Sequence, residues 1–241
     1  DSNITSLPGN YLISVKKTNL YIGQAKNVKS RIKQHNKDKS SLYANYLKKN
    51  IGKYHLKKFN LRFINTDFGR KEIEEVGIPS LKTLLNKSHK NKREPVIIIN
   101  KKKSWRNIQN KKTKIMKVGE RVIFNKKIIK WLDADLPKYP GVYIVFNDKR
   151  DIIYIGESSV LSRRYHMHSN RTYISALRRH IGKEIFHLKF IKKREFSKSG
   201  DKKVDNYLST CGITHVECFI GRLEFEEYLI KKYSPKLNKK I

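Results

Sequence analysis

The hydrophobic pattern near the two ends of the chain is that of paired short strands. Apolar, β-rich runs at 11–15 and 20–23 enclose the polar stretch KKTN, and similar runs at 142–146 and 152–156 enclose NDKRD. Two apolar runs of this length, joined by a few polar residues, are typical of an antiparallel hairpin. We therefore predict one hairpin in each half of the chain.

Each predicted hairpin is followed by helices and one further strand. The stretch 25–35 has apolar residues at helical spacing. The first half is then expected to continue with a helix in 45–52 ended by a glycine, a strand in 56–64, and a helix from 70 that Gly77 and Pro79 break. The second half is expected to continue with a helix in 175–182, a strand in 186–191 and a helix in 222–233 that ends before Pro235. The pattern predicts an α/β (α+β) fold: a small unit used twice, with a short mixed or antiparallel three-stranded sheet flanked by helices.

Short motifs recur in the same order in both halves, which indicates an internal repeat. Tyr-Ile-Gly occurs at 21–23 and at 154–156, and each copy is followed by an arginine and a histidine at the same spacing. Pro-Gly-Asn-Tyr at 8–11 corresponds to Pro-Gly-Val-Tyr at 140–143, and GRKEIEE at 69–75 corresponds to GRLEFEE at 221–227. The spacing leaves about twenty extra residues in the second copy, for which the polar stretch 192–203 is the predicted surface loop.

The segment between the copies matches neither of them. A polar run at 87–94 is followed by an apolar run at 95–100, and 114–124 has the pattern of a hairpin turning at Gly119-Glu120. We predict a small β-rich insert, and hence three parts: a first domain at 1–87, the insert at 88–137 and a second domain at 138–241. Two interpretations of the insert stay open, a linker and a DNA-contacting arm.

The charge of the chain changes the picture, because it points to a polyanionic partner. Lys and Arg number 55 against 21 acids, a formal net charge of +34. Such a surface binds nucleic acid through counterion release. Lysine used simply to make surface, and adhesion to an anionic membrane, are the competing interpretations.

Other features of the composition restrict where the protein works. The sequence has no apolar run long enough to cross a bilayer and no secretory pattern at its beginning, and an initiator Met is missing. Its two cysteines, Cys211 and Cys218, form no zinc pattern. We expect a reducing, cytoplasmic compartment in a prokaryotic or viral context.

The repeated residues carry a chemistry that suits phosphodiester hydrolysis. In the first copy they are Tyr11, Tyr21, Arg31, His35 and Glu74. A carboxylate can hold a divalent cation, an arginine can stabilise charge on the phosphorane, and a phenol or imidazole can take a proton from water. A single protein carboxylate fits Mg²⁺, which keeps several of its waters. The second copy has the same set, namely Tyr143, Tyr154, Arg164, His168 and Glu226.

With these motifs the sequence resembles the GIY-YIG nucleases, over about residues 8–86 and 140–238. The resemblance implies that the two tyrosines of each copy flank the attacking water, one of them as general base. It implies that Arg164 contacts the scissile phosphate, that His168 assists proton transfer, that Glu226 is the metal ligand and that Asn238 braces the site. In the first copy the same roles fall to Arg31, His35 and Glu74, with Asn86 as a weaker match to Asn238.

Several positions depart from the family pattern. Asn10 stands where the family has a hydrophobic residue, and Lys26 is of a type that some members use near the phosphate, where the second copy has Ser159. Gln24 and Glu157 stand where other members place a lysine. Glu157 is unfavourable near a phosphate unless it helps to hold metal or faces away.

The duplication suggests why the chain carries two sites, because a duplex has two strands. We predict a sequence-specific double-strand DNA endonuclease, like a type II restriction enzyme, with one site per strand in a pseudo-symmetric monomer. Each site would use one Mg²⁺ or Mn²⁺. The alternatives are a homing, repair or junction nuclease with one active copy, and a non-catalytic nucleic-acid-binding protein.

Overall fold

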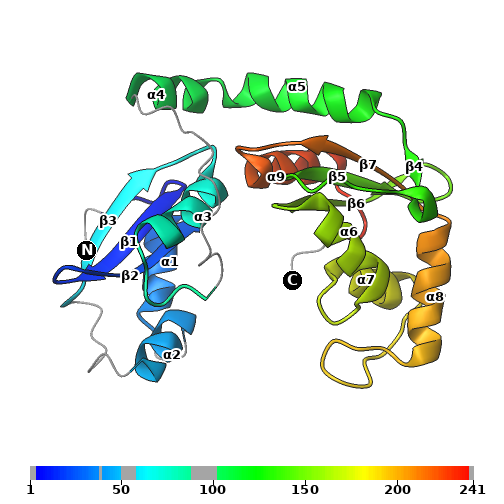
Figure 1. Cartoon of the computed structure of the whole chain (residues 1–241), viewed down its shortest axis with the longest axis horizontal. Helices are drawn as coiled ribbons and strands as arrows, with labels where there is room; N and C mark the ends of the chain where they lie inside the picture. Colours follow the sequence, from blue (N-terminus) through cyan, green and yellow to red (C-terminus); the bar gives the residue numbers. More distant parts are fainter. Residues whose placement is uncertain (1–3, 38–39, 50–57, 88–101, 239–241) are drawn as a thin grey trace. The chain divides into compact units, whose positions relative to one another are not determined.

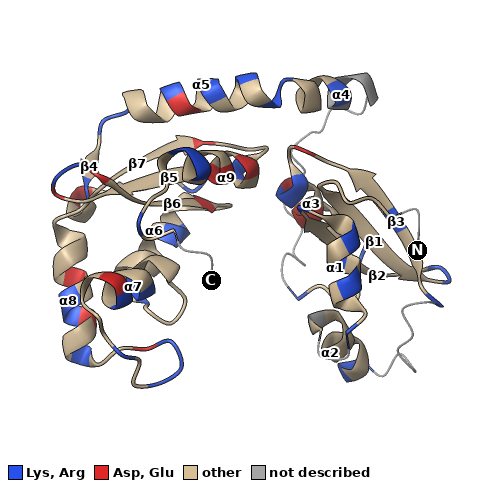
Figure 2. Ribbon diagram, turned by 180° about the vertical axis from the view of Figure 1, so that it is seen from behind, with Lys and Arg blue, Asp and Glu red and all other residues tan. Residues whose placement is uncertain are grey.

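The computed structural model describes residues 4–37, 40–49, 58–87 and 102–238, without the side chains of 41 and 102–105. It divides into two compact units, Asp1–Lys112 and Thr113–Ile241 (Figure 1). Each unit contains an antiparallel sheet flanked by helices. The predicted fold class is therefore confirmed. Lys and Arg lie on helices of both units (Figure 2).

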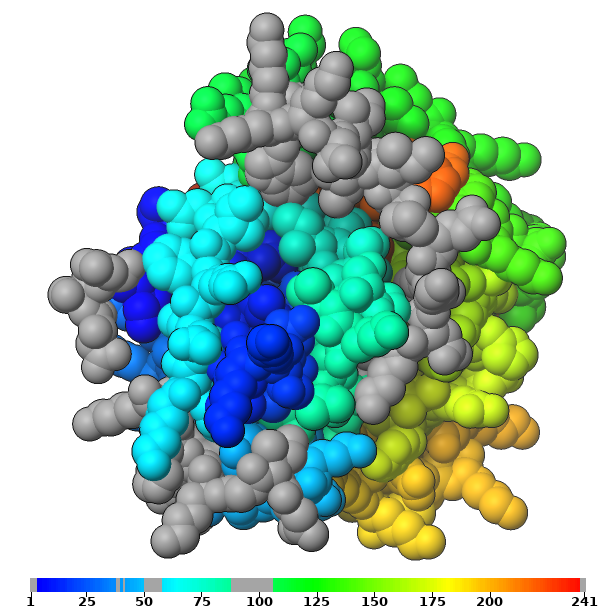
Figure 3. Space-filling model, turned by 60° about the vertical axis from the view of Figure 1, so that its left-hand side comes forward, coloured from blue at the N-terminus to red at the C-terminus, as the bar shows by residue number. Residues whose placement is uncertain are grey.

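The first unit is built on the predicted hairpin and third strand. Strands β1 (Gly9–Val15), β2 (Thr18–Ala25) and β3 (Asn60–Asn65) pair antiparallel in the order β2-β1-β3. The central strand β1 is almost entirely buried, whereas β3 forms an exposed edge, drawn in cyan in Figure 3. The core consists of the buried residues Tyr11, Ile13, Leu20, Val28, Leu42, Tyr46 and Leu85.

Helices α1 (Val28–His35) and α2 (Ser41–Lys48) begin at side-chain caps. Asn27 accepts a hydrogen bond from the Ser30 N–H and Ser40 accepts one from the Tyr43 N–H, which satisfies backbone donors that a helix start leaves open. Helix α4 (Lys102–Asn110) is tied to the same unit by Gln109, whose side chain accepts from the Asp67 and Phe68 N–H groups.

Helix α3 (Arg70–Ser80) corrects the prediction of a break at Gly77 and Pro79, because it runs through both residues. Pro79 lies in the last turn, where its missing N–H removes only one helical hydrogen bond. Gly77 is required by packing: a Cβ there would lie 2.4 Å from Ile22 Cδ1 on β2. The glycine therefore lets α3 approach the sheet and does not end the helix.

The second unit has a four-stranded sheet in the order β4-β7-β5-β6. Its strands are β4 (Ile129–Lys130), β5 (Gly141–Phe146), β6 (Ile152–Ser158) and β7 (Gly212–Glu217). Its helical elements are α5 (Lys112–Asn125), η2 (Trp131–Asp133), α6 (Leu161–Asn170), α7 (Ala176–His180), the π-helical η3 (Ile181–Ile185), α8 (Lys198–Ser209) and α9 (Arg222–Tyr233). Helix α9 ends before Pro235, as predicted.

The predicted third strand at 186–191 is wrong, because that role belongs to β7. β7 pairs with β5 from Gly141↔Glu217 onward, just as β3 pairs with β1 from Gly9↔Asn65. Phe186, Leu188 and Phe190 of this stretch pack against the core instead of pairing in the sheet, as in the stacking of Phe190 on Phe196 with ring centroids 4.9 Å apart.

The extra residues of the second copy form more than the predicted loop. Residues 198–203 of the predicted loop begin helix α8, which packs through the buried residues Val204 and Leu208. Gly182 does not end the preceding helix, which continues as the π-helical turn η3. A Cβ at Gly182 would lie 2.2 Å from Phe196, so this glycine makes room for an aromatic ring.

The prediction of a hairpin at 114–124 is also wrong, because α5 spans this stretch. Met116 and Ile123 are buried, and a Cβ at Gly119 would lie 3.0 Å from the Phe225 ring. Glu120 accepts hydrogen bonds from Tyr228, Lys232 and Tyr233 of α9.

The segment between the copies is thus helical over 102–125 apart from a turn at Lys111, and β4 is its single strand in the described residues. The predicted β-rich insert is wrong there. The predicted strand at 95–100 lies outside the described residues. Because the division falls after Lys112, α4 belongs to the first unit and α5 to the second. In the part of the chain that the structure describes, we find no helix with the length and apolar character needed to cross a membrane.

Candidate active sites

The strand register explains why the two motifs of each copy occur together. Tyr11 on β1 lies opposite Gly23 on β2, and Tyr143 on β5 lies opposite Gly156 on β6. A Cβ at Gly23 would lie 2.4 Å from the Tyr11 hydroxyl oxygen, and one at Gly156 would lie 2.2 Å from that of Tyr143. The glycine of each Tyr-Ile-Gly thus leaves the space that the tyrosine of the first strand occupies.

Each of these tyrosines forms a short hydrogen bond to a buried histidine. The Tyr11 hydroxyl is 2.6 Å from His35 Nε2, and the Tyr143 hydroxyl is 2.6 Å from His168 Nε2. The histidines come from α1 and α6, the helices that directly follow the hairpins.

The second tyrosine of each copy lies beside this pair. The ring centroids of Tyr11 and Tyr21 are 6.2 Å apart at an interplanar angle of 33°, and those of Tyr143 and Tyr154 have the same separation and angle. The sequence repeat is therefore a repeat of geometry.

The arginine and the glutamate complete each group, as the electrostatics of the phenols show. The Glu74 carboxylate raises and the Arg31 guanidinium lowers the pKa values of Tyr11 and Tyr21. In the second unit, Glu226 and Arg164 act in the same opposed way on Tyr143 and Tyr154. Since such effects need short distances, the structure brings all five predicted residues together in each unit.

Burial dominates the ionisation of these groups. It raises the pKa of all four phenols, to about 12 for Tyr154, because a phenolate loses its water. It lowers the pKa of His35 to about 4 and of His168 to about 3, with a further contribution from the nearby arginines. Both imidazoles are therefore neutral at physiological pH. Desolvation also raises the pKa of Glu74, to about 7.

In both units an asparagine side chain forms hydrogen bonds to the backbone of the isoleucine in Tyr-Ile-Gly. Asn238 accepts from the Ile155 N–H at 2.7 Å and donates to the Ile155 carbonyl at 2.7 Å. Asn86 makes the same two bonds to Ile22, at 3.0 and 2.8 Å. The weaker sequence match of Asn86 thus has the same geometry as Asn238.

The positions that depart from the family pattern have structural partners of their own. Asn10 donates to the Arg70 carbonyl at 2.7 Å, and so ties β1 to the start of α3. Glu157 forms a buried ion pair with Arg222 at 2.7 Å, so its carboxylate faces the first residue of α9. Lys26 is exposed just beyond β2.

The sequence patterns missed two residues that support the second histidine. Ser175 Oγ is 2.7 Å from His168 Nδ1, so both ring nitrogens of His168 are hydrogen-bonded. Arg178 is buried and donates to the His168 and Ser169 carbonyls, while it pairs with Asp205 of α8 at 2.6 Å. The serine could have been noticed only as a helix cap, and nothing local in the sequence marks the arginine.

The donor set limits the kind of metal that each site can take. Within the described ranges, no three His, Cys, Asp or Glu side chains gather as a ready-made metal cage. A part-buried carboxylate beside two phenols instead suits a cation that keeps most of its own water, as Mg²⁺ does. Glu74 and Glu226 are the carboxylates in these positions.

Comparison with known proteins agrees with this geometry. Two family models, each described as a GIY-YIG catalytic domain, match residues 8–106 and 122–240. The chain therefore belongs to the GIY-YIG family of nucleases and contains two of its catalytic domains.

Individual relatives match one domain at a time. UvrABC system protein C of Methanococcus maripaludis is 31% identical over 105 residues, which are 44% of this chain and 16% of that protein. The chain thus matches only a small part of the relative's length. The GIY-YIG N-terminal endonuclease domain of UvrC from Thermotoga maritima, solved with magnesium bound, is 24% identical, with 43% of this chain and 88% of that chain covered and a TM-score of 0.28. A point mutant of that domain covers 52% and 97% at 20% identity, with a TM-score of 0.27.

Proposed function

We propose that the chain is a divalent-metal-dependent DNA endonuclease that acts as a monomer, each unit hydrolysing one phosphodiester bond. One observation carries this proposal: the group of two tyrosines, an arginine, a histidine and a glutamate is complete in both units, with the same 2.6 Å tyrosine–histidine contact. A protein that only binds nucleic acid has no need of two such groups. By this proposal the chain cuts both strands of a specific duplex sequence, as a type II restriction enzyme does.

The chemistry assigned to each residue follows from its environment. Neutral His168 can accept a hydrogen bond from the Tyr143 hydroxyl, because its other nitrogen is held by Ser175. Because burial raises the pKa values of Tyr143 and Tyr154, either phenol can act as general base only if nearby positive charge stabilises its phenolate. Arg164 supplies one such charge and is the proposed contact to the scissile phosphate. In the first unit, His35 has the role proposed for His168 and Arg31 has the role proposed for Arg164.

Glu74 and Glu226 are the proposed metal ligands. A bound Mg²⁺ or Mn²⁺ would supply Lewis acidity at the phosphate oxygens. Asn86 and Asn238 hold the Tyr-Ile-Gly strand in register, and Lys26 is a further candidate contact to the phosphate in the first unit. The net charge of +34 supports double-stranded DNA as the partner.

Incubation with supercoiled plasmid, with Mg²⁺ or with excess chelator, tests the proposal. We expect discrete linear fragments with Mg²⁺ and intact plasmid with chelator. Cleavage that persists in chelator would contradict the metal assignment, and a continuous smear of products would contradict sequence specificity.

A second function has support from the comparison with UvrABC system protein C. On this alternative the chain is a repair or junction nuclease in which one copy cuts. The same assay decides between them when branched and damaged duplexes are included: a repair or junction nuclease cuts those and leaves the plain plasmid intact.

A further inference from the structure

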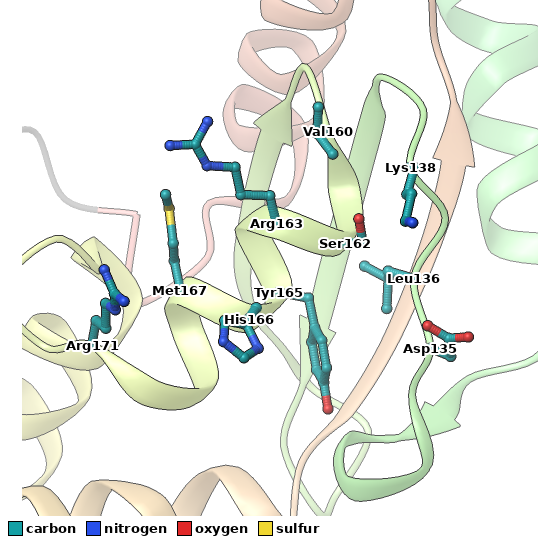
Figure 4. Close-up of a pocket in the computed structure, with 10 residues that line it drawn as sticks. All are labelled: Asp135, Leu136, Lys138, Val160, Ser162, Arg163, Tyr165, His166, Met167 and Arg171. Carbon is teal, nitrogen blue, oxygen red and sulfur yellow. The ribbon is translucent and has the colours of Figure 1, made fainter.

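The second unit has a pocket on a face of α6 that the proposed chemistry does not use. Its volume is about 780 Å³. Figure 4 shows the side chains that line it, which are Asp135, Leu136, Lys138, Val160, Ser162, Arg163, Tyr165, His166, Met167 and Arg171. They come from α6 with its two ends and from the segment that leads into β5.

The backbone fixes the walls of this pocket. The Ser162 N–H donates to the Pro137 carbonyl at 2.9 Å and the Leu161 N–H donates to the Tyr139 carbonyl at 3.0 Å, which join α6 to the segment before β5. The Tyr165 hydroxyl donates to the Trp131 carbonyl, and the Tyr165 ring packs on the Trp131 ring with centroids 5.0 Å apart. The pocket is therefore a built feature of the fold.

The pocket is next to the active site on the same helix. Arg163 and Met167 precede Arg164 and His168 by one position each, so the two pairs lie about 100° apart around α6. By the proposed function Arg164 contacts the scissile phosphate, which makes Arg163, one position before it on α6, a candidate contact to a neighbouring phosphate.

The lining is positively charged. Arg163 and Arg171 lie on one side of the pocket, and Lys138 and Asp135 lie on the other (Figure 4). Across the residues that the structure describes, none of these three cations forms an ion pair with a carboxylate. Three basic side chains against one exposed carboxylate favour an anionic occupant.

The first copy lacks this charge in its sequence. Counting from the matched Pro-Gly and Tyr-Ile-Gly motifs, it has Ser6 in place of Lys138, Ser30 in place of Arg163 and Asp38 in place of Arg171. These three basic residues are thus particular to the second copy, although the catalytic group is common to both.

We propose that this pocket binds backbone phosphates of the DNA strand that the second unit cleaves, beside the scissile phosphate. The inference rests on the proposed function, since it places DNA on α6. The ligand is the phosphodiester backbone and not a base, because the Tyr165 ring already packs on Trp131 and the charged residues of the lining are three basic side chains against one carboxylate. The second unit then binds DNA more tightly than the first.

The test measures DNA affinity against salt, in a background that cannot cut. Glu74→Ala/Glu226→Ala protein binds a short fluorescent duplex, and Kd is followed from 50 to 200 mM salt. Each phosphate contact contributes a slope of about 0.9 in log Kd against log salt. Arg163→Gln, Arg171→Gln and Lys138→Gln should each lower the slope by about this amount. Between 50 and 200 mM salt, the rise in Kd should therefore be about threefold smaller for each variant than for the parent protein. The triple variant should lose about 2.7 units of slope.

Lys149→Gln is the matched control, because Lys149 is an exposed lysine in the turn at the far end of the β5–β6 hairpin. Its slope should be unchanged. The inference is overturned if the three pocket variants keep the original slope, or if Lys149→Gln lowers it equally, since the charge would then act without a site. This assay measures binding alone. If the unmodified protein binds DNA but does not cut it, the proposed function is refuted, and the salt slopes still decide whether the pocket binds phosphates.

Discussion

Replacement of Gly156 by alanine tests the steric basis of the double motif. The new Cβ would lie 2.2 Å from the Tyr143 hydroxyl oxygen and 2.4 Å from its Cζ, well inside van der Waals contact. Gly156 does not have a positive φ, so the backbone itself accepts alanine. The strain therefore falls on the Tyr143 ring, which must move away from β6.

The expected cost combines two effects. Forcing a methyl group into a packed core costs about 1–3 kcal/mol. Displacing the hydroxyl also breaks the 2.6 Å hydrogen bond to His168, and a buried polar group left without its partner costs about 1–3 kcal/mol. We expect a local loss of about 2–6 kcal/mol in the second unit together with loss of its cleavage.

Amide hydrogen exchange in β5 and β6 measures this loss independently of the first unit. Gly200→Ala is the control, because a Cβ there would lie no closer than 3.1 Å to its neighbours, Leu188 Cδ1 and Phe196 Cβ, and α8 accepts alanine well. Tyr143→Phe removes the closest atom of the clash, so the double variant Tyr143→Phe/Gly156→Ala should lose less than the sum of the single variants. Unchanged exchange and full activity in Gly156→Ala would refute the steric argument.

Two further predictions follow from the same sites. Asn238→Ala and Asn86→Ala each leave the N–H and the carbonyl of one isoleucine unpaired. Amide exchange should therefore become faster in β6 and β2 respectively, which corresponds to a local loss of stability of about 2–4 kcal/mol. Asn170→Ala, at an exposed asparagine, is the control, and an equal effect there would contradict the stabilising role of Asn238 and Asn86. His168 has a folded pKa of about 3, below its unfolded value, so the unfolded chain takes up the proton first and stability falls as the pH drops from about 6.5 toward 3. The second unit should lose about 2 kcal/mol between pH 7 and 5, and His168→Gln should remove that dependence; a pH dependence that survives in this variant would show that other groups cause it.

The elements that the sequence predicted correctly are those set by local pattern. Both hairpins and the helices after them follow from alternation and helical spacing within short windows. The tyrosines, arginines, histidines and glutamates could be grouped because the motifs occur twice in the same order. Their roles in catalysis stay predictions.

The errors have tertiary causes. Gly119 has the local pattern of a turn residue, but the ring of Phe225, far away in sequence, is what requires a glycine there. Residues 186–191 have a better strand composition than β7, yet the sheet uses β7. One signal could have found it, since Asn65 ends β3 five positions before Arg70, and Glu217 ends β7 five positions before Arg222. Similarly, no local pattern could show that Glu157 pairs with Arg222.

The most direct test of two active sites is to disable each one separately and map the nicks. Glu74→Ala and Glu226→Ala each remove one proposed metal ligand from a helix that accepts alanine well. On a supercoiled plasmid that carries one recognition site, each single variant should accumulate the nicked circle, and sequencing should place the two nicks on opposite strands. The double variant should bind DNA without cutting it. If Glu226→Ala abolishes all cleavage while Glu74→Ala still produces the linear form, the first unit is not a second active site and the account is contradicted.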